Sequence, residues 1–258
     1  MPAHVLILGG TTEARRLATA LAARPGLRVT TSLAGRVRRP AAIDGEVRVG
    51  GFGGAAGLAD WLRAHRVTAL VDATHPFAER ITANAAEAAR VAGVPHAVLR
   101  RPGWDLDDDW QQSVASLEEA AQAVPRLGQR VFLSTGRLGL AAFAELTAHH
   151  FVVRSVEAPE PPLPPHCEVI LARGPFSLAD ELDLLRTHRI DALVTKDSGG
   201  AATAPKVAAA RSLSLPVVVV RRPELPSGVG ALPDEEAVLG WLAGVIPPED
   251  ACAADTCP

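Results

Sequence analysis

The sequence predicts an α/β protein of two tandem Rossmann-like domains, each with a five-stranded parallel sheet, and an interdomain cleft for ligands. One observation is an internal repeat, since WLRAHRVTALVDAT at 61–74 returns as LLRTHRIDALVTKD at 184–197. GVPHAVLRRP at 93–102 likewise returns as SLPVVVVRRP at 214–223. The copies lie about 120–126 residues apart, a domain-sized period that favours duplication over chance likeness of two parallel-sheet domains. The other observation is that short apolar runs alternate with alanine-rich stretches, as in sheets covered by helices on both faces.

Each repeat contains five runs rich in β-branched residues, which we expect to form strands. They cover 4–8, 27–33, 46–49, 67–72 and 95–99 in the first repeat, and 130–134, 151–156, 168–172, 190–195 and 216–220 in the second. Stretches such as 12–23, 79–92, 203–212 and 234–245 are expected to be helices, with right-handed crossovers between strands. The expected domains are therefore 1–102 and 130–246, with a linker at 103–129 and a disordered tail at 247–258.

Composition and charge narrow the class of protein. The chain has 258 residues, of which 48% are hydrophobic, and its net charge of −3 gives no case for nucleic acid or a membrane surface as a partner. It opens without a signal-peptide pattern, and no run approaches the ~18 apolar residues that span a bilayer. Cys167, Cys252 and Cys257 fit a reducing cytoplasm, and no histidine lies near the tail pair, so we expect neither disulfides nor a metal site. The oligomeric state is left open.

The loop after the first strand has the features of a phosphate-binding turn. Ligands of parallel sheets bind at the carboxyl ends of the strands. There Gly9 and Gly10 permit a sharp turn, and Thr11, Thr12 and Glu13 open a helix whose N-terminal amides can hold a pyrophosphate. The alternative is an ordinary strand-to-helix turn capped by a threonine.

The next two strand ends bear on the kind of dinucleotide. Ser32 and Arg36 follow the second strand, where an NAD-binding domain usually carries an acidic residue for the ribose hydroxyls. A guanidinium here suits a 2′-phosphate and favours NADPH over NADH, although a solvated basic turn is also common. The third strand ends in GGFGG at 50–54, in which Gly51 and Gly53 allow close approach of a flat ligand, or else form a flexible loop tip.

The fourth strand ends in DATHPFAER at 72–80. Asp72, Thr74 and His75 lie where a nicotinamide ring or the reacting substrate atom is expected. The alternative for His75 is an ordinary polar loop residue.

The second repeat places cations and hydroxyls after its own strands. STGR at 134–137 and TKDSGGAATAPK at 195–206 supply Arg137, Lys196, Ser198, Thr203 and Lys206, which we expect to bind acidic groups of a substrate. The Ser-Gly-Gly turn can add backbone amides as an anion nest. For Lys206 the alternative is a solvated helix residue.

Taken in order, these motifs resemble the precorrin-6A reductase family of cobalamin biosynthesis, which includes cobalt-precorrin-6A reductases. The resemblance rests on ILGGTTEAR at 7–15, SLAGR at 32–36, GGFGG, DATHPFA at 72–78, STGR, and KDSGG with Thr203 and Lys206, and covers about 4–245. It implies NADPH as cofactor and reduction of a ring double bond in a tetrapyrrole to give precorrin-6B. The acetate and propionate groups of such a substrate would suit the basic loops. The motifs do not separate the cobalt-free from the cobalt-containing form.

Such a reduction also needs a proton. His75 is our first candidate for the donor and Lys196 the second, and water or the substrate itself is the alternative to both. Other functions stay open at this point. They are an NADPH-dependent reductase of another conjugated anionic substrate, a non-catalytic two-domain anion- or nucleotide-binding protein, and a nucleotide-sugar transferase with twin domains.

Overall fold

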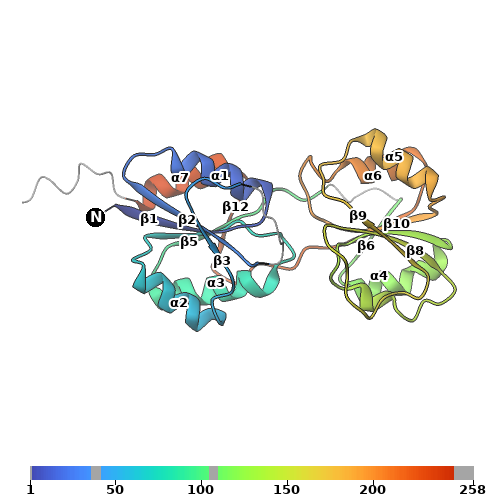
Figure 1. Ribbon diagram of the computed structural model, residues 1–258, viewed down its shortest axis with the longest axis horizontal. Helices are drawn as coiled ribbons and strands as arrows, with labels where there is room; N and C mark the ends of the chain where they lie inside the picture. Colours follow the sequence, from blue (N-terminus) through green and yellow to red (C-terminus); the bar gives the residue numbers. More distant parts are fainter. Residues whose placement is uncertain (1, 36–41, 105–109, 247–258) are drawn as a thin grey trace, which may run out of the picture. The chain divides into compact units, whose positions relative to one another are not determined.

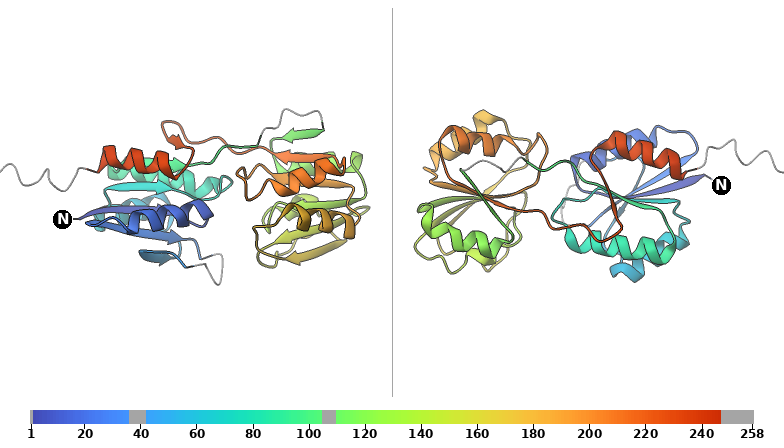
Figure 2. Two further views of the ribbon diagram at one scale, coloured as in Figure 1. Left: turned by 90° about the horizontal axis from the view of Figure 1, so that it is seen from above. Right: turned by 180° about the vertical axis from the view of Figure 1, so that it is seen from behind.

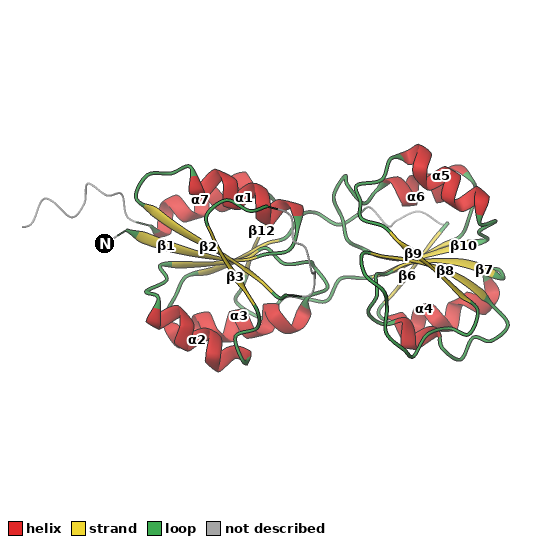
Figure 3. Ribbon diagram, in the orientation of Figure 1, coloured by secondary structure: helices red, strands yellow, loops and turns green. Residues whose placement is uncertain are grey.

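Two compact α/β units make up the protein. The computed structural model describes residues 2–35, 42–104 and 110–246. Unit 1 comprises Met1–Arg101 and Pro223–Pro258, and unit 2 comprises Pro102–Arg222. Each unit is built on one six-stranded sheet in which every pair of neighbouring strands is parallel (Figures 1 and 3).

The sheet of unit 1 has the strand order β12-β5-β4-β1-β2-β3. Its strands are β1 (Ala3–Leu8), β2 (Leu27–Leu33), β3 (Glu46–Val49), β4 (Ala69–Asp72), β5 (His96–Leu99) and β12 (Gly230–Leu232). Helices α1 (Thr12–Ala22) and α7 (Glu235–Val245) cover one face, and α2 (Gly54–Ala64) and α3 (Glu79–Ala92) cover the other (Figure 1).

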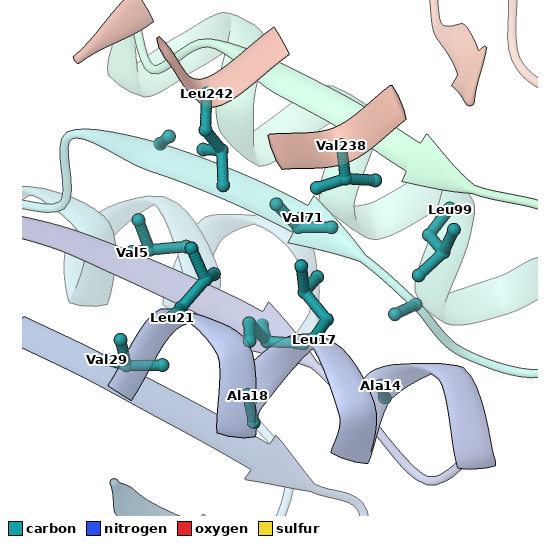
Figure 4. Close-up of a cluster of buried hydrophobic side chains, with 13 residues drawn as sticks. Val5, Ala14, Leu17, Ala18, Leu21, Val29, Val71, Leu99, Val238 and Leu242 are labelled. Carbon is teal, nitrogen blue, oxygen red and sulfur yellow. The ribbon is translucent and has the colours of Figure 1, made fainter. Parts of the chain in front are cut away.

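The core of unit 1 joins segments from both ends of the chain. Leu17 and Leu21 of α1 and Val238 and Leu242 of α7 pack over Val71 and its neighbours in the central strands (Figure 4). All five side chains are at most 1% exposed. Because burying a Leu or Val side chain contributes about 1.5–3 kcal/mol, α7 is an integral part of this unit.

The sheet of unit 2 repeats the same topology in the order β6-β11-β10-β7-β8-β9. Its strands are β6 (Gln111–Val114), β7 (Arg130–Ser134), β8 (His150–Ser155), β9 (Cys167–Leu171), β10 (Ala192–Lys196) and β11 (Val217–Val220). Helix α4 (Leu117–Ala123) lies on one face, and α5 (Leu178–Thr187) and α6 (Pro205–Ser212) lie on the other. Short 3-10 helices span Val124–Arg126 and Leu140–Phe143.

The predicted fold class is confirmed, and the predicted number of strands is wrong. All ten predicted strands are present within one or two residues, and in both sheets the first strand lies between the second and the fourth. Each sheet has a sixth strand, however. These two strands, QQSV and GAL, lie at sheet edges, and their residues are mostly exposed or half-buried. They therefore contain no apolar run from which a strand could be predicted.

The chain is also divided differently from the expected boundaries. Residues 103–129, expected as a linker, supply β6 and α4 to unit 2. Residues 223–246, expected in the second domain, supply β12 and α7 to unit 1. The chain therefore passes from one unit to the other twice, and Figure 2 shows both connecting segments. The pair β6–α4, which follows the first segment of unit 1 in sequence, therefore belongs to unit 2. The pair β12–α7, which follows unit 2, belongs to unit 1.

The repeated Arg-Arg-Pro triplets lie at these two crossings, and their arginines fix the chain there. Arg100 Nη2 donates to the carbonyl of Pro223 at 2.7 Å, and Arg222 Nη2 donates to the carbonyl of Pro102 at 3.0 Å. Arg101 also forms an ion pair with Glu13 at 2.7 Å. Each triplet therefore contributes one arginine that bonds to the proline carbonyl of the other triplet.

In the described part of the chain, every helix is too short or too polar to cross a bilayer. The tail at 247–258 lies outside the described residues, so its expected disorder stays a prediction. The expected interdomain cleft also stays a prediction.

Candidate active site

The turn between β1 and α1 combines an open backbone with a well-anchored helix start. Gly10 has a φ of 125°, and a Cβ added there would meet nothing within 4 Å, so a ligand can approach this peptide closely. Gly9 is instead packed, because its Cβ would lie 2.8 Å from Thr31 Cγ2. Thr11 caps α1 by accepting from the amide of Ala14 at 3.1 Å. The threonine cap that we expected as the alternative is therefore present. It is compatible with phosphate binding, since a capped helix start still presents N-terminal amides.

The neighbouring polar side chains of this turn are engaged within the protein. Thr11 Oγ1 donates to the carbonyl of Ala73 at 2.8 Å and so connects this loop to the one after β4. Thr12 Oγ1 accepts from Arg15 at 3.1 Å. Glu13 is held by Arg101, which makes its carboxylate a support for the crossing segment. The backbone, more than these side chains, is what the turn offers to a ligand.

The ends of β2 and β3 meet beside the glycine loop. Ser32 is only 6% exposed, and its carbonyl accepts from the amide of Gly9 at 2.9 Å. Gly50 and Gly53 have φ values of 118° and 83°, and a Cβ added at either glycine, or at Gly51, would meet nothing within 4 Å. The backbone of the loop is therefore uncovered at these three glycines, and its contact with a flat ligand stays a prediction. Arg36 lies outside the described residues.

A residue that the sequence did not single out organises this loop. Arg48 donates from Nη1 to the carbonyl of Gly50 at 2.5 Å and from Nη2 to the carbonyl of Gly51 at 2.7 Å. Its guanidinium carbon lies 3.8 Å from the centre of the Phe52 ring. The sequence shows only an arginine two residues before the first glycine of GGFGG. Its role becomes clear once the pairing of β2 with β3 is known, because this pairing places Arg48 opposite Ser32.

A buried carboxylate holds the loop after β4. Asp72 is 0% exposed, so it supports the loop and does not face a ligand as expected. It accepts from the amide of Thr74 at 2.9 Å, from Thr74 Oγ1 at 2.6 Å and from Thr82 Oγ1 at 2.6 Å. These bonds connect β4 to α3 and set the direction in which the chain leaves the sheet, and therefore the position of His75.

His75 is exposed and has a defined tautomer. Its Nδ1 accepts from the amide of Phe77 at 3.2 Å. An acceptor nitrogen carries no proton, so the neutral ring bears its proton on Nε2. In the neutral ring Nε2–H can donate a hydrogen bond to a bound molecule, and delivery of its proton requires that Nδ1 be protonated as well.

His75 borders a pocket within unit 1. The pocket has a volume of about 220 Å³ and is lined by Thr74, His75, Pro76, Glu79, Thr82, Ala83, Val98, Leu99, Arg100 and residues 223–226. It lies at the carboxyl ends of β4 and β5, with apolar walls and a few polar groups. Because drug-sized ligands occupy about 300–1,000 Å³, this pocket suits a single ring and not a whole dinucleotide.

In unit 2 the loop from β10 to α6 gathers four of the predicted residues. Lys196 is partly buried, and this burial lowers the pKa of its ammonium group. Ser198 and Lys206 are 8% and 6% exposed. Thr203 Oγ1 donates to the carbonyl of Gly199 at 2.5 Å and closes the turn between them. The result is a cationic, hydroxyl-rich loop at a carboxyl strand end.

Two further residues complete this loop. Trp104 lies with its ring centre 5.2 Å from Lys206 Nζ, and its amide donates to Asp197 Oδ1 at 3.1 Å. Asp197 also forms an ion pair with Arg222 at 3.0 Å, which connects the loop to the second crossing. Neither Trp104 nor Asp197 was predicted, because their roles depend on chain segments about 93 residues apart.

Arg137 is not gathered with the others. It forms an ion pair with Glu157 at 3.2 Å, so its charge is already compensated. Its expected role toward a substrate stays a prediction. In the same loop, the buried Thr135 Oγ1 has no hydrogen-bond partner among the described residues and is a polar atom that the sequence did not single out.

The carboxyl strand ends carry open glycine turns, a capped helix start, a buried carboxylate and a basic loop. These features are typical of a Rossmann-like enzyme, here built from two units. A family model described as "Precorrin-6x reductase CbiJ/CobK" matches residues 4–243. The chain therefore belongs to the precorrin-6x reductase family, and it is an oxidoreductase.

Individual relatives agree with this assignment. The chain is 52% identical over 241 residues to a precorrin-6A reductase of Rhodococcus erythropolis, covering 93% of this chain and 97% of the relative. It is 49% identical over 244 residues to one of Mycobacterium tuberculosis, covering 94% and 98%. A solved structure called "CobK precorrin-6A reductase" superposes with a TM-score of 0.87 at 41% identity, covering 94% of this chain and 96% of that chain.

Proposed function

We propose that the protein reduces a ring double bond of precorrin-6A with NADPH, giving precorrin-6B, as a cytoplasmic enzyme of cobalamin biosynthesis. The observation that carries this proposal is the near full-length similarity to proteins named precorrin-6A reductase. Relatives with that name are 43–52% identical to the chain, whereas relatives named cobalt-precorrin-6A reductase are 30–33% identical. This difference favours the cobalt-free substrate.

The residues of unit 1 fit NADPH. The open peptide at Gly10 and the N-terminus of α1 suit its pyrophosphate, and the end of β2 offers Ser32 in place of the acid that would bind two ribose hydroxyls. Arg36, in the following loop, is proposed to contact the 2′-phosphate. The pocket beside Thr74 and His75 has a size that suits the nicotinamide ring. NADPH, when bound, supplies the hydride.

The protein's own groups supply orientation and a proton. His75 is proposed to act as the imidazolium, in which Nδ1 is also protonated and no longer accepts from Phe77, and to donate the Nε2 proton to the carbon next to the one that accepts the hydride, leaving the neutral ring. Asp72 keeps His75 in position through the loop, and the capped turn at Thr11 does the same for the cofactor. Lys196 is the second candidate, because burial lowers its pKa and makes its ammonium group a stronger acid than that of an exposed lysine.

The basic loop of unit 2 is proposed to bind the carboxylates of the tetrapyrrole. Lys196 and Lys206 provide charge and Ser198 provides a hydroxyl donor, while Thr203, whose hydroxyl donates to the carbonyl of Gly199, holds the turn on which they lie. A charge-assisted hydrogen bond to a carboxylate contributes about 1.5–3 kcal/mol, so two or three of them would account for micromolar to millimolar binding. Arg137 is proposed to add a further contact if Glu157 releases it.

One assay tests the proposed function. The purified protein is mixed with NADPH and either precorrin-6A or its cobalt complex, and the absorbance of the cofactor and of the macrocycle is followed. We expect both to change together with precorrin-6A, and much more slowly with the cobalt complex or with NADH. No oxidation of NADPH with either macrocycle would refute the proposal.

A variant tests the proton donor in the same assay. His75→Ala is expected to lower single-turnover reduction about a hundredfold to ten-thousandfold while NADPH affinity stays nearly unchanged. An unchanged rate and pH profile would remove His75 from the chemistry, and the same measurements on Lys196→Ala would then test the second candidate.

A further inference from the structure

Arg48 is fixed in place at the end of β3, and its direct partners hold it from three sides. Two carbonyls, of Gly50 and Gly51, accept from its two terminal nitrogens, and the ring of Phe52 lies against its guanidinium face at 3.8 Å. Arg48 also faces Ser32 across the pair of strands β2 and β3. Its Nη1 lies 3.5 Å from Ser32 Oγ. The guanidinium therefore has a defined orientation before any ligand binds.

The charge of Arg48 has no counter-charge in the described part of the chain. Many arginines there form ion pairs with a carboxylate, namely Arg28, Arg63, Arg90, Arg101, Arg137, Arg154 and Arg222. Arg48 is half-buried, and its partners are neutral carbonyls, a hydroxyl and an aromatic ring. Because partial burial of a charge without a partner is unfavourable, a fixed cation of this kind favours an anionic ligand.

The donors of Arg48 are sufficient for such a ligand. A guanidinium has five N–H groups, and the bonds to Gly50, Gly51 and Ser32 use three of them. The remaining groups include the Nε–H. A phosphate near Ser32 could accept from the guanidinium and from the Ser32 hydroxyl together, since these two lie next to each other.

The position in the fold identifies the anion. In a Rossmann-like domain the end of the second strand meets the adenosine ribose, and its side chain distinguishes a 2′-hydroxyl from a 2′-phosphate. We propose that Arg48 is a specificity-determining residue that binds the 2′-phosphate of NADPH beside Ser32. This inference rests on the proposed function, in which unit 1 binds NADPH.

A purely structural role for Arg48 has to be separated from this one. Its bonds to Gly50 and Gly51 also hold the glycine loop, and loosening that loop would weaken any adenine dinucleotide. Loss of a phosphate contact, in contrast, affects only ligands that carry the 2′-phosphate. The measured quantity is therefore the ratio of two affinities, and not the affinity for NADPH alone.

The experiment measures dissociation constants of NADPH and NADH for the full chain by calorimetry. Adenosine 2′,5′-bisphosphate and 5′-AMP serve as probes without a nicotinamide. Arg48→Ala is expected to weaken NADPH and adenosine 2′,5′-bisphosphate about tenfold to a hundredfold, and NADH and 5′-AMP by no more than about twofold. Arg48→Lys keeps the charge but loses the fork and the stacking on Phe52, so an intermediate loss is expected.

Arg28→Ala is the matched control. Arg28 lies at the opposite end of the same strand pair and bonds to Glu46, so its removal changes net charge equally but should leave the affinity ratio unchanged. Equal weakening of all four ligands by Arg48→Ala, or no weakening, overturns the proposal. If Arg48→Ala does not fold by circular dichroism, the ratio measured for Arg48→Lys decides, and a wild-type ratio refutes the proposal. Wild-type protein that binds neither dinucleotide refutes the proposed function instead.

Discussion

Asp72 offers a sharp test of how the active-site loop is held. Its carboxylate is fully buried and accepts three hydrogen bonds, two from Thr74 and one from Thr82. Asp72→Ala leaves three donors without their acceptor, and each buried donor left unpaired costs about 1–3 kcal/mol. Thr82 borders the pocket and can turn to water there, so we expect a total loss of about 3–5 kcal/mol in the free energy of unfolding of unit 1.

Asp72→Asn separates the bonds from the charge. The amide oxygen can still accept from Thr74, and the amide nitrogen can donate to Thr82 Oγ1, so a smaller loss of about 1–2 kcal/mol is expected. The matched control is Asp44→Ala. Asp44 is exposed and accepts a bond of 2.6 Å from Thr19 Oγ1, so its removal should change stability much less.

The assay is urea unfolding followed by circular dichroism, together with hydrogen exchange of the segment from β4 to α3. In Asp72→Ala the exchange protection of this segment should fall most, and reduction of precorrin-6A should slow because His75 loses its position. A loss below about 1 kcal/mol, or one equal to that of Asp44→Ala, would refute the supporting role of Asp72.

Three further predictions concern the division of the chain, pH and the substrate loop. The fragment 102–222 should fold alone with a cooperative thermal transition, whereas 130–246 should not, because it lacks β6 and α4; equal transitions would contradict the observed units. Burial lowers the pKa of His4 below its ordinary value of 6.5, so the unfolded chain binds more protons in that range and stability should fall as pH drops below about 6.5. Urea titrations from pH 5 to about pH 8 should show a weaker dependence in His4→Asn, and an identical dependence would exclude His4 as a source. Lys196→Ala should raise the KM for the tetrapyrrole about tenfold or more with little change in NADPH affinity, and the reverse pattern would place the cofactor in unit 2.

The sequence predicts ten of the strands in the described residues well, because most of them are apolar runs of the right length between turns. It misses β6 and β12, which lie at sheet edges and have little apolar surface to bury. The crossing of the chain between units is also invisible in the sequence. A strand-helix pair has the same local pattern whichever sheet accepts it, and the choice depends on long-range pairing such as Gly230 with Ala97.

The candidate site shows the same limit. Glycine turns and strand-end residues such as Gly10, Ser32 and Lys196 can be found because strand-end position and residue type alone indicate ligand contact. Asp72 and Arg48 act through partners across the sheet or in the next loop. Their roles cannot be predicted from the sequence, because the sequence does not show which residues they contact. Tertiary contacts turned Asp72 from an expected ligand-facing residue into a buried support.

The two crossings have a consequence for synthesis of the protein. Unit 2 is contiguous and complete once the ribosome has made β11 and the two residues after it, but unit 1 lacks β12 and α7 until Gly230–Val245 have been made. Helix α7 ends at Val245, about 144 residues after the first segment of unit 1 ends at Arg101, and at about 5–20 residues per second this interval lasts on the order of 7–29 s. During that time the apolar surface of α1 that Val238 and Leu242 will cover is exposed to water or to chaperones. The domain that is translated first is therefore the one that is completed last.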